Sequence, residues 1–215
     1  MAGLTSRRWH AEWAWTGERV EADVVLEVDG DTFTRVEAGT PPPPDAARLA
    51  GITLPGLANA HSHAFHRALR GRTHTGAGDF WAWRERMYAV AARVDPDDYR
   101  RLALACFAEM ALAGITIVGE FHYLHHRLDG TPYDDANAMA DSLSAAAAEA
   151  GIRLTLLDTL YLRAGFDDEP LDPVQRRFSD GDADRWAARV ETVADAWATN
   201  RLARVGVAVH SVRAV

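Results

Sequence analysis

Four short apolar runs, separated by helical patterns, constrain the fold of this chain more than any other feature. The runs are Leu54–Ala60, Ile115–Phe121, Ile152–Leu160 and Val205–Val209. Strands that alternate with helices at this spacing indicate a parallel β/α architecture, and near-continuous Val, Ile and Leu content is typical of strands buried on both faces. We expect about four βα units, which is half of a (β/α)8 TIM-like barrel. A doubly wound sheet is disfavoured, because no glycine-rich loop follows the first run.

The region before the first run has a different pattern. Short alternating segments flank Asp29-Gly30, a dipeptide typical of a β-hairpin turn, and Pro41–Pro44 form a stiff connection. We therefore expect residues 1–54 to form part of a small β-sandwich and residues 55–215 to form the N-terminal half of the barrel. Tryptophans 9, 13 and 15 are expected to be core residues rather than ligand contacts.

Histidines follow the first and last apolar runs. His61 and His63 are two residues apart, so on an extended strand they point to the same side, and His210 follows the fourth run. The carboxyl ends of barrel strands meet at one rim, where such enzymes place their chemistry. Three imidazoles leave a tetrahedral Zn²⁺ with one open position, as in catalytic sites. The competing interpretation is a solvated strand end with chance histidines.

Other chemically notable residues lie near the second run. His122, His125 and His126 are expected in a loop over the mouth of the site, in contact with substrate or ligands, rather than in a separate metal site. Glu120 either orients a ligand histidine or is solvated, and the sequence does not decide. Cys106 lies in a helical apolar stripe and is expected to be a packed thiol.

The overall composition excludes several classes of partner. The formal net charge is -8 and the pI is about 5.5, so no basic face for nucleic acid or anionic membrane is expected. No apolar run approaches the roughly 18–20 residues of a membrane span, and no signal peptide is evident. With a single cysteine, no internal disulfide forms, and a cytoplasmic location is expected.

Four stretches in order carry a family resemblance: LPGLANAHSHAFHRALRG, FWAWRERMY, EFHYLHH and HSVRAV. Together they resemble the amidohydrolase superfamily and, within it, the formimidoylglutamate deiminases. The resemblance implies one Zn²⁺ per site, with His61, His63 and His210 as ligands. It also places the remaining aspartate ligand and the acid–base groups beyond Val215, so the chain is expected to be the N-terminal half of a longer enzyme.

The resemblance further implies that Arg84, Tyr123 and Arg213 contact substrate. His66 stands where the family can use a substrate-binding glutamine, which leaves its role open. The implied reaction is hydrolysis of N-formimidoyl-L-glutamate, a small dicarboxylate, to N-formyl-L-glutamate and ammonia. Two arginine forks suit such a dianion. The alternatives are a guanine- or adenosine-type deaminase and an inactive truncated fragment. Such families are commonly dimeric, so a homodimer is among the expected assemblies.

Overall fold

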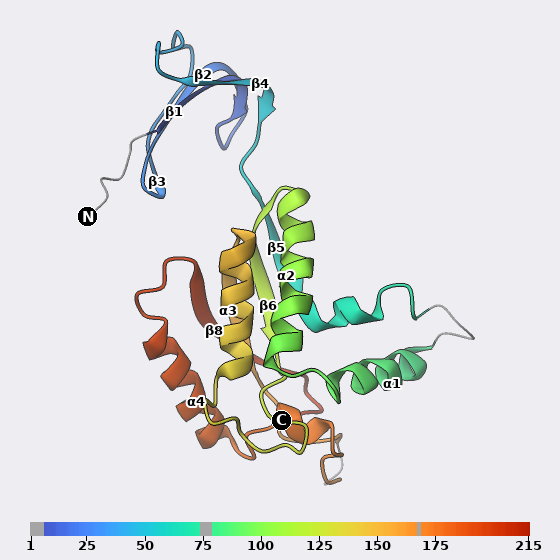
Figure 1. The fold of residues 1–215 in the computed structure, drawn as a ribbon. Coiled ribbons are helices and arrows are strands. Elements are labelled where there is room, and N and C mark those ends of the chain that lie inside the picture. Colours follow the sequence, from blue (N-terminus) through green and yellow to red (C-terminus); the bar gives the residue numbers. More distant parts are fainter. Residues whose placement is uncertain (1–6, 74–78, 167–168) are drawn as a thin grey trace. The chain divides into compact units, whose positions relative to one another are not determined.

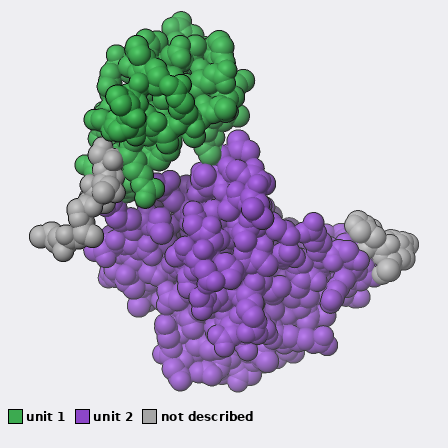
Figure 2. Space-filling model, turned by 45° about the horizontal axis from the view of Figure 1, so that its top comes forward, with its two compact units in different colours: residues 1–56 green, residues 57–215 purple. Residues whose placement is uncertain are grey.

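A computed structural model describes residues 7–73, 79–166 and 169–215 of the chain. It contains two compact units, residues 1–56 and 57–215, which Figure 2 colours separately. The boundary between them lies two residues after the one expected from the sequence. Each unit is treated by itself below.

The first unit is one four-stranded sheet in the order β3-β2-β1-β4. Its strands are β1 (Arg7–Trp15), β2 (Val20–Asp29), β3 (Thr32–Glu37) and β4 (Ala47–Thr53). β2 and β3 pair antiparallel around Asp29-Gly30, which confirms the predicted hairpin. β1 pairs antiparallel with β2 and parallel with β4. Assignment of this sheet to a β-sandwich stays a prediction.

The expectation that the tryptophans of the first unit are core residues is wrong for two of them. Trp13 and Trp15 are 44% and 41% exposed, whereas Ala14 between them is 3% exposed. Alternate residues of a strand point to opposite faces, so burial of Ala14 turns both rings outward. The register of the β1–β4 pairing shifts between Ala11 and Trp13, which places Ala14 on the buried side of the strand and both tryptophans on the exposed side.

The second unit is built on a parallel sheet whose strands follow chain order, β5-β6-β7-β8. The strands are β5 (Leu57–Ser62), β6 (Ile115–His122), β7 (Arg153–Leu160) and β8 (Ala203–Val209). Figure 1 shows the helices that connect them. This arrangement confirms the predicted α/β fold with about four βα units of a barrel.

Several helices of this unit begin or end at a residue that favours a helix end. They are η1 (Ala64–Leu69), α1 (Phe80–Ala91), α2 (Pro96–Leu112), α3 (Ala138–Ala150), η2 (Gln175–Phe178) and α4 (Ala183–Ala196). Asp79 and Asp95 cap α1 and α2 by accepting backbone N–H groups, each at 2.8 Å, and Gly151 ends α3 in the left-handed conformation. None of the helices that the structure describes is long and apolar enough to cross a membrane.

The two faces of the sheet carry different residues. In β6, Val118, Glu120 and His122 are buried, and α2 packs on the same strand. The residue between the last two, Phe121, points to the opposite face, where its ring lies 5.7 Å from that of His61. The sheet thus separates a helix-covered core from the face that carries the histidine pair.

Candidate metal and substrate site

The carboxyl ends of the four parallel strands meet in register. Ser62 of β5 pairs with Glu120 of β6, and Leu160 of β7 pairs with Val209 of β8. A cavity of about 380 Å³ lies at these ends, within the size range of ligand pockets. It is lined by all seven residues predicted for the site: His61, His63, His66, Arg84, Tyr123, His210 and Arg213.

His61 and His63 form the centre of this group. Their Nε2 atoms are 2.9 Å apart, and the His63 Nδ1 lies 3.1 Å from the carbonyl oxygen of Phe121. Because a carbonyl oxygen can only accept, His63 Nδ1 carries the proton and its Nε2 lone pair faces His61. Burial, followed by the nearby His61, lowers the pKa of His63 to about 4, so the ring is neutral near pH 7.

His210 lies in the same cavity but among aromatic rings. Its ring centroid is 5.0 Å from that of Tyr123 and 4.8 Å from that of Tyr161. Across the described residues, His61, His63 and His210 do not form a group whose ligand atoms all lie within 4.8 Å of one another. The structure therefore brings His61 and His63 into contact and holds His210 farther away. Its role as a third ligand stays a prediction.

His66 and Tyr123 face each other across the cavity wall. The His66 Nε2 and the Tyr123 hydroxyl oxygen are 3.0 Å apart, and Tyr123 is 3% exposed. Burial lowers the pKa of His66 to about 3 and raises that of Tyr123 well above its ordinary value. Both groups are therefore neutral near pH 7 and act through hydrogen bonds.

The two predicted arginines differ in how firmly they are held. Arg84 donates to the Tyr88 hydroxyl at 3.0 Å, and its guanidinium lies 4.7 Å from the centroid of that ring and 5.6 Å from that of Trp81. Arg84 therefore both stacks on aromatic rings and lines the cavity. Arg213 also lines the cavity and is exposed.

A hydrogen-bonded group beside Arg84 was not predicted from the sequence. The buried Gln175 donates through Nε2 to the Tyr88 hydroxyl at 3.3 Å and to the Tyr161 hydroxyl at 3.0 Å. Tyr161 directly follows β7, so the strand-end argument applied to histidines would have found it. Gln175 lies in the long loop after β7, where no pattern marks it.

Glu120 is not solvated, which removes one of its two predicted roles. It is fully buried on the helix-covered face, and its Oε1 accepts the backbone N–H of Ala64 at 2.6 Å. Burial raises the pKa of this carboxyl to about 7. Glu120 therefore holds the turn that directly follows His63. Ser62 is also buried, and because strand residues alternate it points away from His61 and His63 on either side of it.

The expectation that His122, His125 and His126 line the mouth of the site is wrong. All three are at most 3% exposed, and none lines the cavity. His122 belongs to the helix-covered face because strand residues alternate, and its neighbour Phe121 takes the cavity side. His122, His125 and Asp158 instead form a buried group whose ligand atoms lie within 4.8 Å of one another.

The chain is similar in sequence to curated proteins that are named as deiminases or deaminases. The chain is 47% identical to a formimidoylglutamate deiminase of Pseudomonas aeruginosa over 139 residues, which cover 63% of the chain and 31% of that protein. It is 31% identical to an 8-oxoguanine deaminase of the same organism over 80 residues, covering 37% of the chain and 17% of that protein.

Among solved structures, an amidohydrolase from Brucella melitensis matches with a TM-score of 0.90 and 39% identity, over 97% of this chain and 47% of that one. The chain thus spans about a third of the curated deiminase and about half of the crystallised amidohydrolase. The model of the amidohydrolase family matches residues 52–214. The chain therefore belongs to the amidohydrolase family.

Proposed function

We propose that this chain contributes to a zinc-dependent enzyme that hydrolyses N-formimidoyl-L-glutamate to N-formyl-L-glutamate and ammonia. The observation that carries the proposal is the meeting of seven predicted side chains in one cavity at the strand ends. The 47% identity to a formimidoylglutamate deiminase supports the choice of substrate. In the net reaction, water adds to the formimino carbon and the C–N bond to the departing ammonia breaks.

The donor atoms of the histidine pair fit a zinc ion. The His63 Nδ1–H donates a hydrogen bond to the carbonyl oxygen of Phe121, which leaves the Nε2 lone pair toward His61, the arrangement that a ligand histidine requires. His61 and His63 would hold the metal, with His210 as the proposed third histidine. When bound, zinc supplies a Lewis acid that lowers the pKa of a coordinated water to about 7. The remaining ligand and the acid–base groups are not assigned to residues of this chain.

The remaining residues suit a dianionic substrate. Arg84 is held by Tyr88, so its planar fork is already oriented toward the cavity. Arg213 supplies a second fork, and the neutral Tyr123 and His66 supply hydrogen bonds. Local positive groups matter because the chain carries a net charge of -8, which would otherwise repel a dicarboxylate. We further propose a cytoplasmic location, a homodimer, and no nucleic-acid or membrane partner.

The substrate assignment is tested by ammonia release from the zinc-loaded protein. Arg84→Ala and Arg213→Ala are expected to raise KM for formimidoylglutamate by about tenfold or more each, since a charged hydrogen bond is lost. Arg101→Ala, which breaks an exposed pair with Asp98, serves as the control and should leave KM unchanged. Turnover of guanine or adenosine, insensitive to both cavity arginines, would favour a purine-type deaminase instead.

The metal assignment is tested separately. His61→Ala and His63→Ala are expected to lose bound zinc, measured by metal analysis of the purified protein. His210→Ala distinguishes a metal ligand from a substrate contact. Loss of zinc supports the ligand role, whereas retained zinc with a raised KM refutes it and supports a substrate contact. If the 215-residue chain binds zinc but releases ammonia only within a longer polypeptide, the inactive-fragment alternative is correct for the chain alone.

A further inference from the structure

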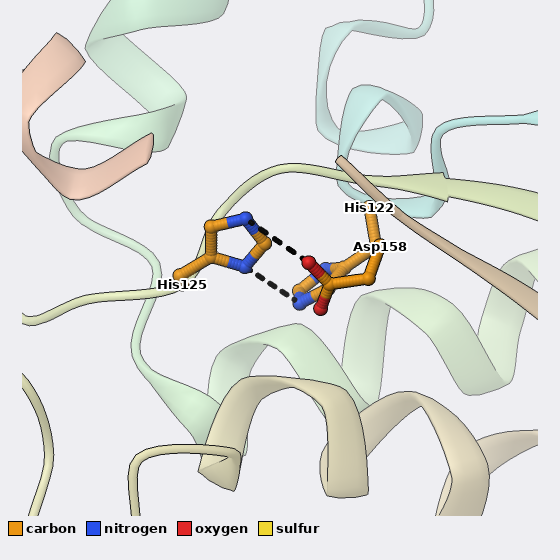
Figure 3. A group of neighbouring side chains, drawn as sticks. All are labelled: His122, His125 and Asp158. Atoms are coloured by element: carbon orange, nitrogen blue, oxygen red, sulfur yellow. Dashed lines mark hydrogen bonds and ion pairs between the residues drawn. The ribbon is translucent and has the colours of Figure 1, made fainter. Parts of the chain in front are cut away.

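A buried polar group occupies the carboxyl ends of β6 and β7 on the helix-covered face. His122, His125 and Asp158 are each at most 1% exposed. Figure 3 shows both nitrogens of the His125 ring engaged, one by His122 and the other by Asp158. Three potential ligands this close suggest a metal site, and the hydrogen bonds around them test that idea.

The partners of His125 determine the positions of the ring protons. His125 Nε2 faces the carbonyl oxygen of Thr159 at 3.2 Å and a carboxylate oxygen of Asp158 at 3.8 Å. Both partners only accept, so Nε2 carries the proton and, in a neutral ring, Nδ1 is the acceptor. Burial lowers the pKa of His125 well below its ordinary value, so the ring is neutral.

The same reasoning extends to His122. Its Nε2 lies 3.3 Å from the accepting Nδ1 of His125, so His122 Nε2 must donate. Its Nδ1 then accepts from the hydroxyl of the buried Tyr99, 3.4 Å away. Burial lowers the pKa of His122 to about 4, in agreement with one proton on this ring. A relay therefore runs in one direction from Tyr99 through His122 and His125 to Thr159.

The third potential ligand is equally engaged. Asp158 Oδ1 accepts from Trp186 and from Arg189, each at 2.9 Å, and Oδ2 accepts from Arg189 at 2.8 Å. The guanidinium of Arg189 thus already supplies the positive charge that balances this carboxylate. Every ring nitrogen of His122 and His125 is likewise engaged in a hydrogen bond. A divalent cation would have to displace Arg189 and break hydrogen bonds of both rings, so the group is built for hydrogen bonding rather than for metal binding.

The relay holds a stretch of chain whose neighbouring residues lie on the opposite face of the sheet. The carbonyl oxygen of Phe121, directly before His122, accepts a hydrogen bond from His63 Nδ1–H, and the hydroxyl of Tyr123, directly after it, contacts His66. The backbone N–H of His125 is held by the carbonyl of Arg177 at 3.0 Å. Anchoring His122 and His125 on one face therefore fixes Phe121 and Tyr123 on the other.

We propose that His122 and His125 are positioning residues, which hold Phe121 and Tyr123 in the candidate site through a one-directional hydrogen-bond relay and bind no metal ion. The consequence for substrate affinity rests on the proposed function, whereas the relay itself does not. They place the Phe121 carbonyl oxygen, which orients His63, and the Tyr123 hydroxyl, which faces His66.

The relay is tested by NMR of the ring nitrogens in protein labelled with ¹⁵N-histidine, with assignment from His122→Asn and His125→Asn. Both rings are expected in the Nε2–H form, with signals unchanged by one equivalent of Zn²⁺, while those of His61 and His63 shift. An Nδ1–H ring at either position, or a zinc-dependent shift of either ring, overturns the proposal. Spectra in which zinc moves no histidine would contradict the proposed metal site and still support the relay.

The positioning role is tested with His125→Phe, which keeps a ring and removes both nitrogens. The ring signals of His63 and His66 are expected to shift, and KM for formimidoylglutamate to rise about tenfold, as for one lost hydrogen bond. His125→Asn, which retains an acceptor for His122, should recover part of the KM. The control is His126→Asn in the same loop, whose ring pairs with Asp180 outside the relay. Equal KM changes in His125→Phe and the control, or unmoved signals of His63 and His66, refute the positioning role.

Discussion

Removal of the Arg189 side chain should cost the second unit a large share of its stability, because this cation balances the carboxylates of Asp158 and Asp180. Arg189 is 7% exposed and forms a fork on Asp158, which is fully buried, with distances of 2.8 and 2.9 Å. It also pairs with Asp180 through Nε and Nη2, each at 3.0 Å. Replacement by methionine keeps most of the volume and leaves two carboxylates without their cation.

The magnitude follows from what remains around each carboxylate. Among the residues that the structure describes, Asp158 keeps the Trp186 hydrogen bond and the neutral His125 ring 3.8 Å away, and Asp180 keeps its contact with His126. Breaking a buried ion pair on one side costs about 3–5 kcal/mol, mostly because a charge is left uncompensated in a region of low polarity. We expect Arg189→Met to lower the free energy of unfolding by that amount near pH 8.

The loss should also depend on pH, with a sign that can be stated in advance. Although burial raises it, hydrogen bonds from His126 and Arg189 hold the pKa of Asp180 below its ordinary value. A lowered carboxyl pKa stabilises the protein above the unfolded value and loses that effect as the pH falls through the folded value. In Arg189→Met the hydrogen bonds from Arg189 are lost while burial still raises the pKa of Asp180, so the variant's carboxyl can take up a proton at a pH where that of wild type stays ionised. The deficit relative to wild type should therefore be smaller at pH 5 than at pH 8.

The measurement is urea unfolding followed by circular dichroism at both pH values. Asp158→Asn combined with Arg189→Met should recover part of the loss, because the orphaned charge is gone. Arg101→Met, at an exposed pair with Asp98, is the control and should change little. A loss no larger than in the control, or an equal loss at pH 5 and pH 8, would falsify the argument from buried charge.

Three further predictions use other parts of the second unit. Burial depresses the pKa of His122 and of His125, so below the unfolded histidine pKa of about 6.5 the unfolded chain binds more protons than the folded one. Stability should therefore fall from there toward pH 4 by up to about 1.4 kcal/mol per pH unit for each ring. Urea unfolding at pH 5 and 7 checks this, and an unchanged slope in His122→Asn contradicts it. Burial raises the pKa of Cys106 to about 11, so its alkylation at pH 8 should be much slower in the folded chain than in urea, and equal rates would refute packing of the thiol. A Cβ on Gly119 would lie 2.9 Å from the backbone oxygen of Ala60, so Gly119→Ala should cost about 1–3 kcal/mol in urea unfolding. Gly206→Ala, whose closest neighbour would be the side chain of Leu157 at 3.1 Å, should cost less, and the reverse order would contradict the clash.

The sequence predicted the parallel α/β unit well because its signals are local and repeated. Asp79 and Asp95 mark helix starts through their side-chain carboxylates, and Gly151 marks a helix end through its left-handed backbone, so no distant contact is needed to find them. The pair His61 and His63 follows from strand alternation alone. Because the strand and helix patterns are local, the sequence predicted the α/β fold class without reference to the site.

Other features depend on contacts that no local pattern carries. The strand end Glu120-Phe121-His122 buries its two polar residues, so apolar patterning in the sequence cannot show which of its residues faces the cavity. Gln175 reaches Tyr88 and Tyr161 only through the course of a long loop. Arg84, Tyr123 and Arg213 were assigned through family resemblance, because an arginine or tyrosine by itself gives no sign of a site.

The order of the strands has a consequence for how the second unit can be assembled. Each strand of β5-β6-β7-β8 lies beside the one made just before it, so no strand has to enter between two others. During synthesis from the N-terminus, growth can proceed at a single edge, one βα unit at a time. His61 lies in the first of these four strands to be made, and His210 directly follows the fourth. The cavity walls that carry both histidines can therefore meet only after all four strands have left the ribosome.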